Sequence, residues 1–210
     1  MPDNFWSNKN VEPKRNFRFL FNISKFPNVE WIVKTVEKPK YNISNIPHKF
    51  INHTFNYPGR VVWNPIAVTL VDPVQPVDAS NTLNKFLLAS GYRMPWGNAD
   101  KSMKSASHSL EKKDSVNSLG EVTLTQLGAR EAPASNKVSI ADQWKLYNAY
   151  ITGDVNFGTL SYGDEELTTL SFTLQYDWAY MARSGGGPEQ NMDQWLTLAE
   201  SFAEKLLGLA

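Results

Sequence analysis

The clearest signal along the chain is a strict alternation of apolar and polar residues in the segment 170–181, LSFTLQYDWAYM. The apolar set is Leu170, Phe172, Leu174, Tyr176, Trp178 and Tyr180, and the intervening set is Ser171, Thr173, Gln175, Asp177 and Ala179. A period of two is typical of a half-buried β-strand, because successive side chains point to opposite faces. We therefore expect one strand through this segment, with one face against a core and the other toward a wet surface.

Other segments repeat this pattern. Residues 16–23, NFRFLFNI, alternate in the same way, and residues 29–41, VEWIVKTVEKPKY, predict a second strand with Trp31 and Val33 on one face. Between residues 41 and 71 we expect two or three strands, interrupted by Pro47 and by a turn at YPGR, residues 57–60. The strand pattern resumes from residue 121 and continues, with a pause at 131–137, to residue 182.

One helix is expected inside this β-rich region, over residues 78–90. Asp78 or Ser80 can cap its start and Gly91 can end it. Its predicted buried face consists of Ala79, Leu83, Phe86 and Leu87. The polar stretch that follows, to Gly120, is long for a connection and predicts a mobile loop or an extended hairpin.

These elements predict a mainly β fold: an antiparallel β-sandwich or barrel with one packed helix, extended loops and a C-terminal helical extension. We divide the chain into an N-terminal arm (1–15), a β domain (16–182), and a linker with a C-terminal amphipathic helix (183–210). The apolar stripe of that last helix is Trp195, Leu198, Phe202 and Leu206. A helix joined through the Gly-rich linker RSGGGPEQN is expected to dock on another surface.

Composition narrows the possible functions. Lys plus Arg and Asp plus Glu are equal at 21 each, so a net charge of zero predicts no strong attraction to nucleic acid or to an anionic membrane. There is no cysteine, which removes thiol nucleophiles and cysteine metal sites. With no secretory leader or membrane-spanning stretch in view, we expect a soluble protein made in the cytoplasm, with no membrane partner.

No constellation of residues predicts catalysis. His48, His53 and His108 have no companion ligands at metal-site spacing, so we expect no metal and no other cofactor. The acidic run GDEEL, 163–167, is interpreted as a solvated turn, and SGGGP, 184–188, as a linker that lacks the Lys and Ser/Thr of a phosphate loop. The chain is therefore not expected to be an enzyme. Its unexplained apolar segments, the arm, residues 48–57 and the terminal helix, favour assembly.

The order of elements resembles that of the T4-like phage tail tube proteins. The resemblance rests on WIVKTVEKPKYNISNIPHKFINHTFNYPGRVVWNPIAVTLVD, residues 31–72, followed by the 78–90 helix, and on WKLYNAYITGDVNFGTLSYGDEELTTLSFTLQYDWAYM, residues 144–181. It covers roughly residues 16–94 and 120–180. It is carried by ordered patterns of strands and turns rather than by one sharp motif.

The resemblance implies a structural virion protein of a contractile tail, in which six copies form a ring and rings stack into the tube through which DNA leaves the capsid. It implies stacking contacts from a loop whose predicted interface residues are His48, Phe50, Ile51, His53, Phe55 and Tyr57. It also implies a lumen or other wet face made of Thr169, Ser171, Thr173, Gln175 and Asp177. The implied partners are other copies of the chain, tail sheath, tape measure and baseplate proteins, and DNA only in transit. The implied location is the virion tail, assembled in the host cytoplasm.

The sequence departs from a minimal tube subunit in its 93–118 insertion and its 183–210 extension. These departures leave open a baseplate tube initiator or a tail-completion ring with the same architecture. An alternative of another class is a β module that binds nucleic acid or carbohydrate through the 48–57 loop and the Lys-rich insertion. Steep salt dependence of DNA binding would favour that module over a tube, whose lumen must let DNA slide.

Overall fold

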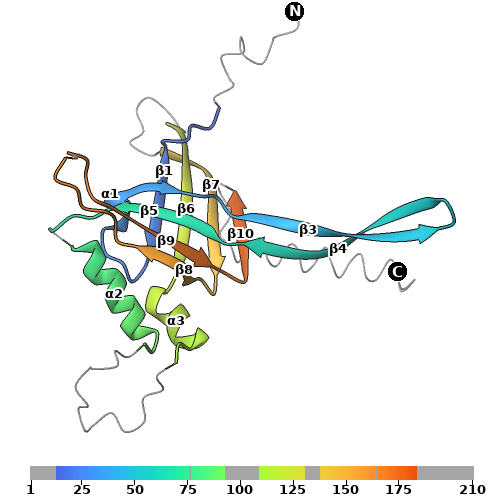
Figure 1. The fold of residues 1–210 in the computed structure, drawn as a ribbon. Helices are drawn as coiled ribbons and strands as arrows, with labels where there is room; N and C mark the ends of the chain where they lie inside the picture. Colours follow the sequence, from blue (N-terminus) through green and yellow to red (C-terminus); the bar gives the residue numbers. More distant parts are fainter. Residues whose placement is uncertain (1–12, 76, 93–108, 131–137, 164, 184–210) are drawn as a thin grey trace, which may run out of the picture. The chain divides into compact units, whose positions relative to one another are not determined.

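The computed structural model describes residues 13–75, 77–92, 109–130, 138–163 and 165–183 (Figure 1). The chain divides into two interleaved compact units. One consists of residues 1–20, 124–145 and 180–210, and the other of residues 21–123 and 146–179. The predicted boundaries of the arm and of the C-terminal extension stay predictions, because residues 1–12 and 184–210 lie outside the described part.

The fold is mainly β, with antiparallel sheets and short helices, which confirms the predicted fold class. In chain order the elements are β1 (Phe19–Ile23), α1 (Val29–Ile32), β2 (Val33–Val36), β3 (Lys40–Phe50), β4 (His53–Asn64), β5 (Ile66–Val71), α2 (Ala79–Ala89), α3 (Lys112–Leu119), β6 (Val122–Arg130), β7 (Val138–Tyr147), β8 (Tyr150–Asn156), β9 (Thr169–Gln175) and β10 (Trp178–Arg183). Strands β1, β6, β7 and β10 form one sheet in that order, and strands β2, β5, β9 and β8 form another. Within the part of the chain that the structure describes, strands β3 and β4 pair only with each other.

The β2–β5–β9–β8 sheet lies within the second unit, and its pairs are all antiparallel. Strand β9 runs through its interior with Leu170 opposite Leu70 and Phe172 opposite Val68. These four side chains are buried, and so are Leu174 and Tyr176. The predicted core face of residues 170–176 is therefore confirmed.

Helix α2 covers part of this core, as its sequence predicts. The Asp78 carboxylate accepts a hydrogen bond from the Asn81 backbone N–H at 2.8 Å, which satisfies one of the free donors at the helix start. Leu83 and Phe86 are buried, and the Phe86 ring meets Phe26 edge to face with centroids 5.7 Å apart. Leu87, predicted on the same face, is instead exposed.

The prediction of a single strand over 170–181 is wrong beyond Gln175. Strand β9 ends at Gln175, and β10 begins at Trp178 in the other sheet. At the break, the Asp177 N–H donates to the Tyr147 carbonyl at 3.0 Å, and the Trp178 ring stacks on Tyr147 with centroids 3.8 Å apart. The alternation then reverses, since Ala179 is buried and Trp178 is partly exposed. At the start of β10 the small side chain of Ala179 is therefore buried, and the large side chain of Trp178 lies at the surface.

Two helices were not predicted. Residues 29–32 form α1 where a strand was expected, so Trp31 leaves the sheet and is 84 % exposed. Residues 112–119 form α3 inside the stretch expected to be a loop or hairpin. Its end is fixed by Gly120, which has a φ of 71° and whose N–H donates to the Val116 carbonyl. The rest of that insertion, 93–108, lies outside the described residues.

In the first unit, polar contacts tie strands β6 and β7 to the segment that precedes β1. The buried Asp142 carboxylate pairs with the Lys14 ammonium at 2.5 Å, and Gln143 donates to the Thr125 hydroxyl at 3.1 Å. Within the described ranges, no helix is long and apolar enough to cross a membrane.

Candidate assembly surface

Strands β3 and β4 form a long two-stranded ribbon that extends away from the sheet of its own unit (Figure 1). They pair from Lys40 opposite Asn64 at the base to Phe50 opposite His53 at the end. The turn is formed by Ile51 and Asn52, and Ile51 adopts a left-handed φ of 51°. A β-branched residue in that conformation is strained. The pairing of β3 with β4, and not the intrinsic conformational preference of Ile51, therefore stabilises the turn.

The turn predicted at residues 57–60 is not a turn. Strand β4 continues through Pro58 and Gly59, and the pairing register shifts opposite them, between Ile43 and Asn45. The Arg60 N–H donates to the Ser44 hydroxyl at 3.0 Å across this irregularity. A Cβ at Gly59 would collide with that hydroxyl and would lie 3.0 Å from the Ser44 carbonyl oxygen, so glycine fits where the two strands approach closely. The Pro-Gly pair marks a bulge.

The outer half of the ribbon is amphipathic. Residues paired across two antiparallel strands lie on the same face, as do residues two apart on one strand. The pairs Ile46–Tyr57, His48–Phe55 and Phe50–His53 therefore share one face, which we call the apolar ribbon face. The alternating pairs Asn45–Pro58, Pro47–Asn56 and Lys49–Thr54 share the other face.

The structure thus brings five of the six predicted interface residues onto one surface and places the sixth, Ile51, at the tip. It adds Ile46, which the sequence pattern did not single out because Pro47 obscured the alternation. Phe50 is 60 % exposed and Ile51 is 85 % exposed, and every residue of β3 is exposed. Exposed apolar surfaces of this extent are typical of interaction sites, so the ribbon is the candidate assembly surface.

The base of the ribbon is anchored to the core. Trp63 packs edge to face against Tyr41, with centroids 5.1 Å apart, and contacts the Tyr176 ring at 5.9 Å. Burial of Tyr176 raises the pKa of its hydroxyl. Beside this cluster, the Glu37 carboxylate accepts from the Lys40 ammonium at 3.2 Å and from the Ala67 N–H at 3.3 Å, and these bonds lower the pKa of Glu37. These contacts connect the base of the ribbon to the core of its own unit.

Four of the five residues predicted to form a wet face do share one surface of the β2–β5–β9–β8 sheet. Thr169, Ser171, Thr173 and Gln175 alternate with the buried residues of β9 and are half-buried. The neighbours of the two central residues in register are also small and uncharged: Ser171 lies opposite Thr69, which lies opposite Thr35, and Thr173 lies opposite Ala67 and Thr152. Toward the ends of β9, Thr169 lies opposite Val71 and Gln175 lies opposite Tyr150. The middle of the sheet therefore has an uncharged surface rich in hydroxyl groups.

The fifth residue, Asp177, does not belong to that surface. It lies in the link between β9 and β10, where its carboxylate accepts from the Lys112 ammonium at 2.7 and 2.8 Å and from the Asn148 amide at 2.7 Å. The bond from Lys112, followed by that from Asn148, lowers the pKa of Asp177. Because α3 was not predicted, its ion pair with Asp177 was not foreseen either.

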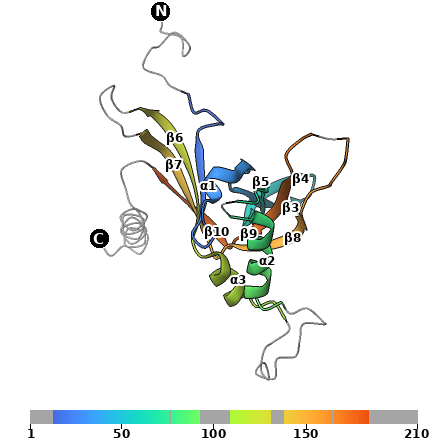
Figure 2. The same cartoon turned by 90° about the vertical axis from the view of Figure 1, so that its left-hand side faces the viewer.

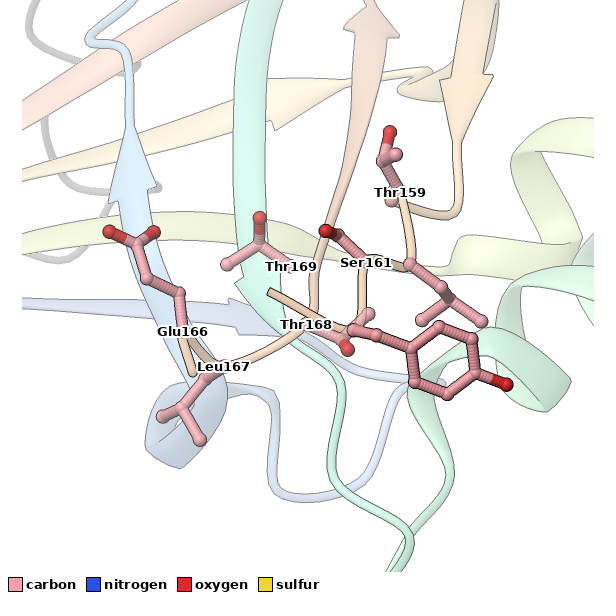
Figure 3. Close-up of a pocket in the computed structure, with 9 residues that line it drawn as sticks. Thr159, Ser161, Glu166, Leu167, Thr168 and Thr169 are labelled. Atoms are coloured by element: carbon pink, nitrogen blue, oxygen red, sulfur yellow. The ribbon is translucent and has the colours of Figure 1, made fainter. Parts of the chain in front are cut away.

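The loop between β8 and β9 encloses a hollow of about 460 Å³, lined by residues 158–162 and 166–169 (Figure 3). Figure 3 shows the Glu166 carboxylate set apart from the hydroxyls of Thr159 and Ser161, so these groups do not form a nucleophile and base pair. Tyr162, Glu165 and Glu166 are exposed, in keeping with a solvated turn. No group of three metal-ligating side chains occurs among the residues that the structure describes.

The predicted docking helix, with Trp195, Leu198, Phe202 and Leu206, lies outside the described residues, as does most of the N-terminal arm. Their roles stay predictions.

Of the comparisons with known proteins, the one with solved structures bears on the fold. No family model matches the chain, and no curated protein matches it in sequence. Among solved structures, a chain from the sheath/tube terminator of the PVC extracellular contractile injection system aligns with a TM-score of 0.53 and 13 % identity, over 82 % of this chain and 99 % of that one. A chain from the anti-feeding prophage baseplate gives 0.53 and 13 % over 82 % and 97 %, and one from the cap that terminates its tube gives 0.52 and 14 % over 82 % and 93 %. At this identity the likeness extends to the fold, which this chain shares with components of contractile injection systems.

Proposed function

We propose that the chain is a structural subunit of the tube of a contractile tail or injection device, in which it forms six-membered rings that stack through the ribbon. The observation that carries the proposal is the apolar ribbon face, an exposed surface on a two-stranded element without a core of its own. Such a ribbon is marginal in water and is stabilised when another surface covers it. The fold shared with chains of a tube terminator, a baseplate and a tube cap supports this function.

The uncharged face of the β2–β5–β9–β8 sheet supports the same proposal. Protein surfaces that hold DNA do so through lysine and arginine, which displace counterions from the phosphates. The predicted wet face has no lysine or arginine at its four positions on β9, which are Thr169, Ser171, Thr173 and Gln175. A lumen lined by these uncharged side chains lets DNA pass without binding it tightly. In this function the chain is not an enzyme. Its partners are further copies of itself, with sheath, tape measure and baseplate proteins next to the tube.

The test is electron microscopy of concentrated purified protein, wild type against the double variant Phe50→Asp and Phe55→Asp. The wild type is expected to form stacked hollow rings, and the variant is expected to stay dispersed because two carboxylates would be buried unpaired at the interface. The matched control, Thr54→Asp with Asn56→Asp, adds the same charge to the opposite face of the ribbon. If both double variants assemble like the wild type, the ribbon face is not the interface.

A second candidate is a ring that begins or ends the tube, as in the sequence-based alternative of a tube initiator or tail-completion ring. The fold shared with chains of a terminator, a baseplate and a cap supports it, while the same fold in a chain of a sheath-tube complex supports the tube. In the same micrographs this function predicts isolated rings that do not stack. DNA binding by the monomer that falls steeply with salt would instead support the nucleic-acid-binding module.

A further inference from the structure

The Ile51 residue at the tip of the ribbon is strained and exposed at the same time. It is the first residue of a two-residue loop, where its φ is 51°. Glycine or asparagine is preferred at such a position, and the other non-glycine residues with a positive φ in the described chain are both asparagines, Asn28 and Asn148. The Ile51 side chain is 85 % exposed, and the ribbon extends away from helices α2 and α3 of its own unit (Figures 1 and 2). Contacts with the described part of its own chain therefore do not offset the strain.

A strained backbone at an exposed position points to a function for the side chain that it carries. A glycine at residue 51 would form the same turn without the clash between Cβ and the carbonyl oxygen. What isoleucine adds is an apolar side chain at the end of the apolar ribbon face, next to Phe50, which is 60 % exposed. Such a side chain lowers the free energy only when an apolar surface of another molecule covers it.

The edges of the ribbon disfavour one mode of binding, the addition of a strand from a partner. Phe50 and His53 flank the two-residue loop and form a hydrogen-bonded pair, so the pairs that alternate with them turn their backbone N–H and C=O groups outward. Pro47 and Pro58 belong to these outward-facing pairs, one on each strand. Each edge therefore lacks an N–H donor that an added strand would need. Binding through the outer half of the ribbon depends on its side chains.

We propose that Ile51 inserts its side chain into an apolar pocket of a second copy and is a major determinant of the affinity between subunits. The inference rests on the proposed function, in which the ribbon joins one copy to another. It adds a residue and a mode of contact, in which the tip enters end-on and no strand is added. Ile51 then lowers the stability of the free ribbon and raises the affinity of the assembly. Replacing it changes these two quantities in opposite directions, which a residue with a purely structural role would not do.

The test compares Ile51→Asn with Val74→Asn in the full-length protein. Asparagine is polar and tolerates a positive φ, so the first change removes both the strain and the apolar side chain. Val74 is also β-branched and is 86 % exposed, but it lies between β5 and α2, so the second change controls for the loss of an exposed apolar group. Hydrogen exchange of the ribbon amides is measured in dilute protein. Self-association is measured by sedimentation velocity at rising protein concentration.

The Ile51→Asn variant is expected to exchange its ribbon amides about five- to tenfold more slowly than the wild type, because its turn contains no strained residue. The concentration needed for self-association is expected to rise at least about tenfold, because a polar side chain replaces the buried apolar one. Ile51→Val keeps both the strain and an apolar side chain, so it should change either quantity by less than about fivefold. Val74→Asn should change neither.

Equal or faster exchange in Ile51→Asn overturns the inference, because the strain at the tip is its premise. Unchanged self-association of Ile51→Asn also overturns it, as does a wild type that stays monomeric at every concentration. Electron microscopy of the same samples separates this inference from the proposed function. Self-association that depends on Ile51 but yields no stacked rings supports the inference and removes the tube. Tubes that form equally well with Ile51→Asn overturn the inference and leave the tube.

Discussion

Phe172 and Thr173 are neighbours on β9 that point to opposite faces of the sheet, and they allow the two faces to be compared with one pair of substitutions. Phe172 is 2 % exposed and lies opposite Val68 in the interior of the sheet, whereas Thr173 is half-buried on the hydroxyl-rich face. We predict that Phe172→Ala strongly destabilises the protein and that Thr173→Ala does not.

The magnitude follows from burial. A buried phenylalanine removes about 150–250 Å² from water, and at about 25 cal/mol per Å² this is worth roughly 4–6 kcal/mol as an upper bound. Measured Phe-to-Ala costs in protein cores are about 3–5 kcal/mol. Since a domain is stable by about 5–15 kcal/mol in total, Phe172→Ala should remove a large share of the free energy of unfolding. Thr173→Ala leaves no cavity in the core and should cost less than about 1 kcal/mol.

The assay is urea unfolding followed by circular dichroism, with both variants and the wild type measured at the same low protein concentration so that assembly does not contribute. The urea concentration at the midpoint of unfolding should fall far more for Phe172→Ala than for Thr173→Ala. The dependence of the free energy of unfolding on urea concentration should be similar for the two variants. Equal losses for the two variants would refute the assignment of faces, and with it the placement of the wet surface.

Two further predictions concern the links around this sheet. Because Asp177 has a lowered pKa in the folded chain, its contribution to stability is present above the ordinary aspartate pKa of about 3.9 and is lost as the pH falls through the lower folded value. Asp177→Asn should flatten the dependence of stability on pH in that acidic window, and an unchanged profile would show that the Lys112 and Asn148 bonds do not persist in solution. Gly158, with a φ of 89° and a Cβ position 2.7 Å from the Thr169 carbonyl oxygen, should not accept a side chain, so Gly158→Ala is expected to lower stability by about 1–3 kcal/mol. Gly163→Ala in the same loop, where a Cβ meets its nearest atom at 4.0 Å, serves as the control and should be nearly neutral in thermal unfolding.

Local pattern predicted the regular parts of this fold well. Period-two alternation located β1 and β9, and the Asp78 cap with the Leu83 and Phe86 spacing located α2. The burial of these residues repeats with the period of a single strand or helix. The pattern is therefore visible in the sequence without knowing which other elements pack beside it.

Two of the errors share a physical cause, because each depends on a contact distant in sequence. Alternation alone could not show that β9 ends before Asp177, since the break depends on Lys112 and Asn148, 65 and 29 residues away. Pro58 and Gly59 fit a turn locally, but Ser44 on the facing strand turns them into a bulge.

The candidate surface was predicted in part. The residues at 48–57 were noticed because they are too apolar for a solvated tip, yet their gathering on one face depends on the pairing register. Helix α3 was missed entirely, since its sequence is weakly apolar and its position depends on contacts with α2 and β8.

The ribbon has no hydrophobic layer beneath its outer half, and this has a kinetic consequence. A lone hairpin is frayed for part of the time. Binding to a partner orders it, and the conformational entropy lost in that step reduces the free energy of binding. In the proposed tube, the first encounter between two free subunits would then be weak and short-lived. A subunit that joined a preformed ring would gain several contacts at once, which would compensate that entropy. The proposed function therefore predicts that growth begins slowly and proceeds from existing templates, so that newly made subunits stay apart until an assembly site is ready.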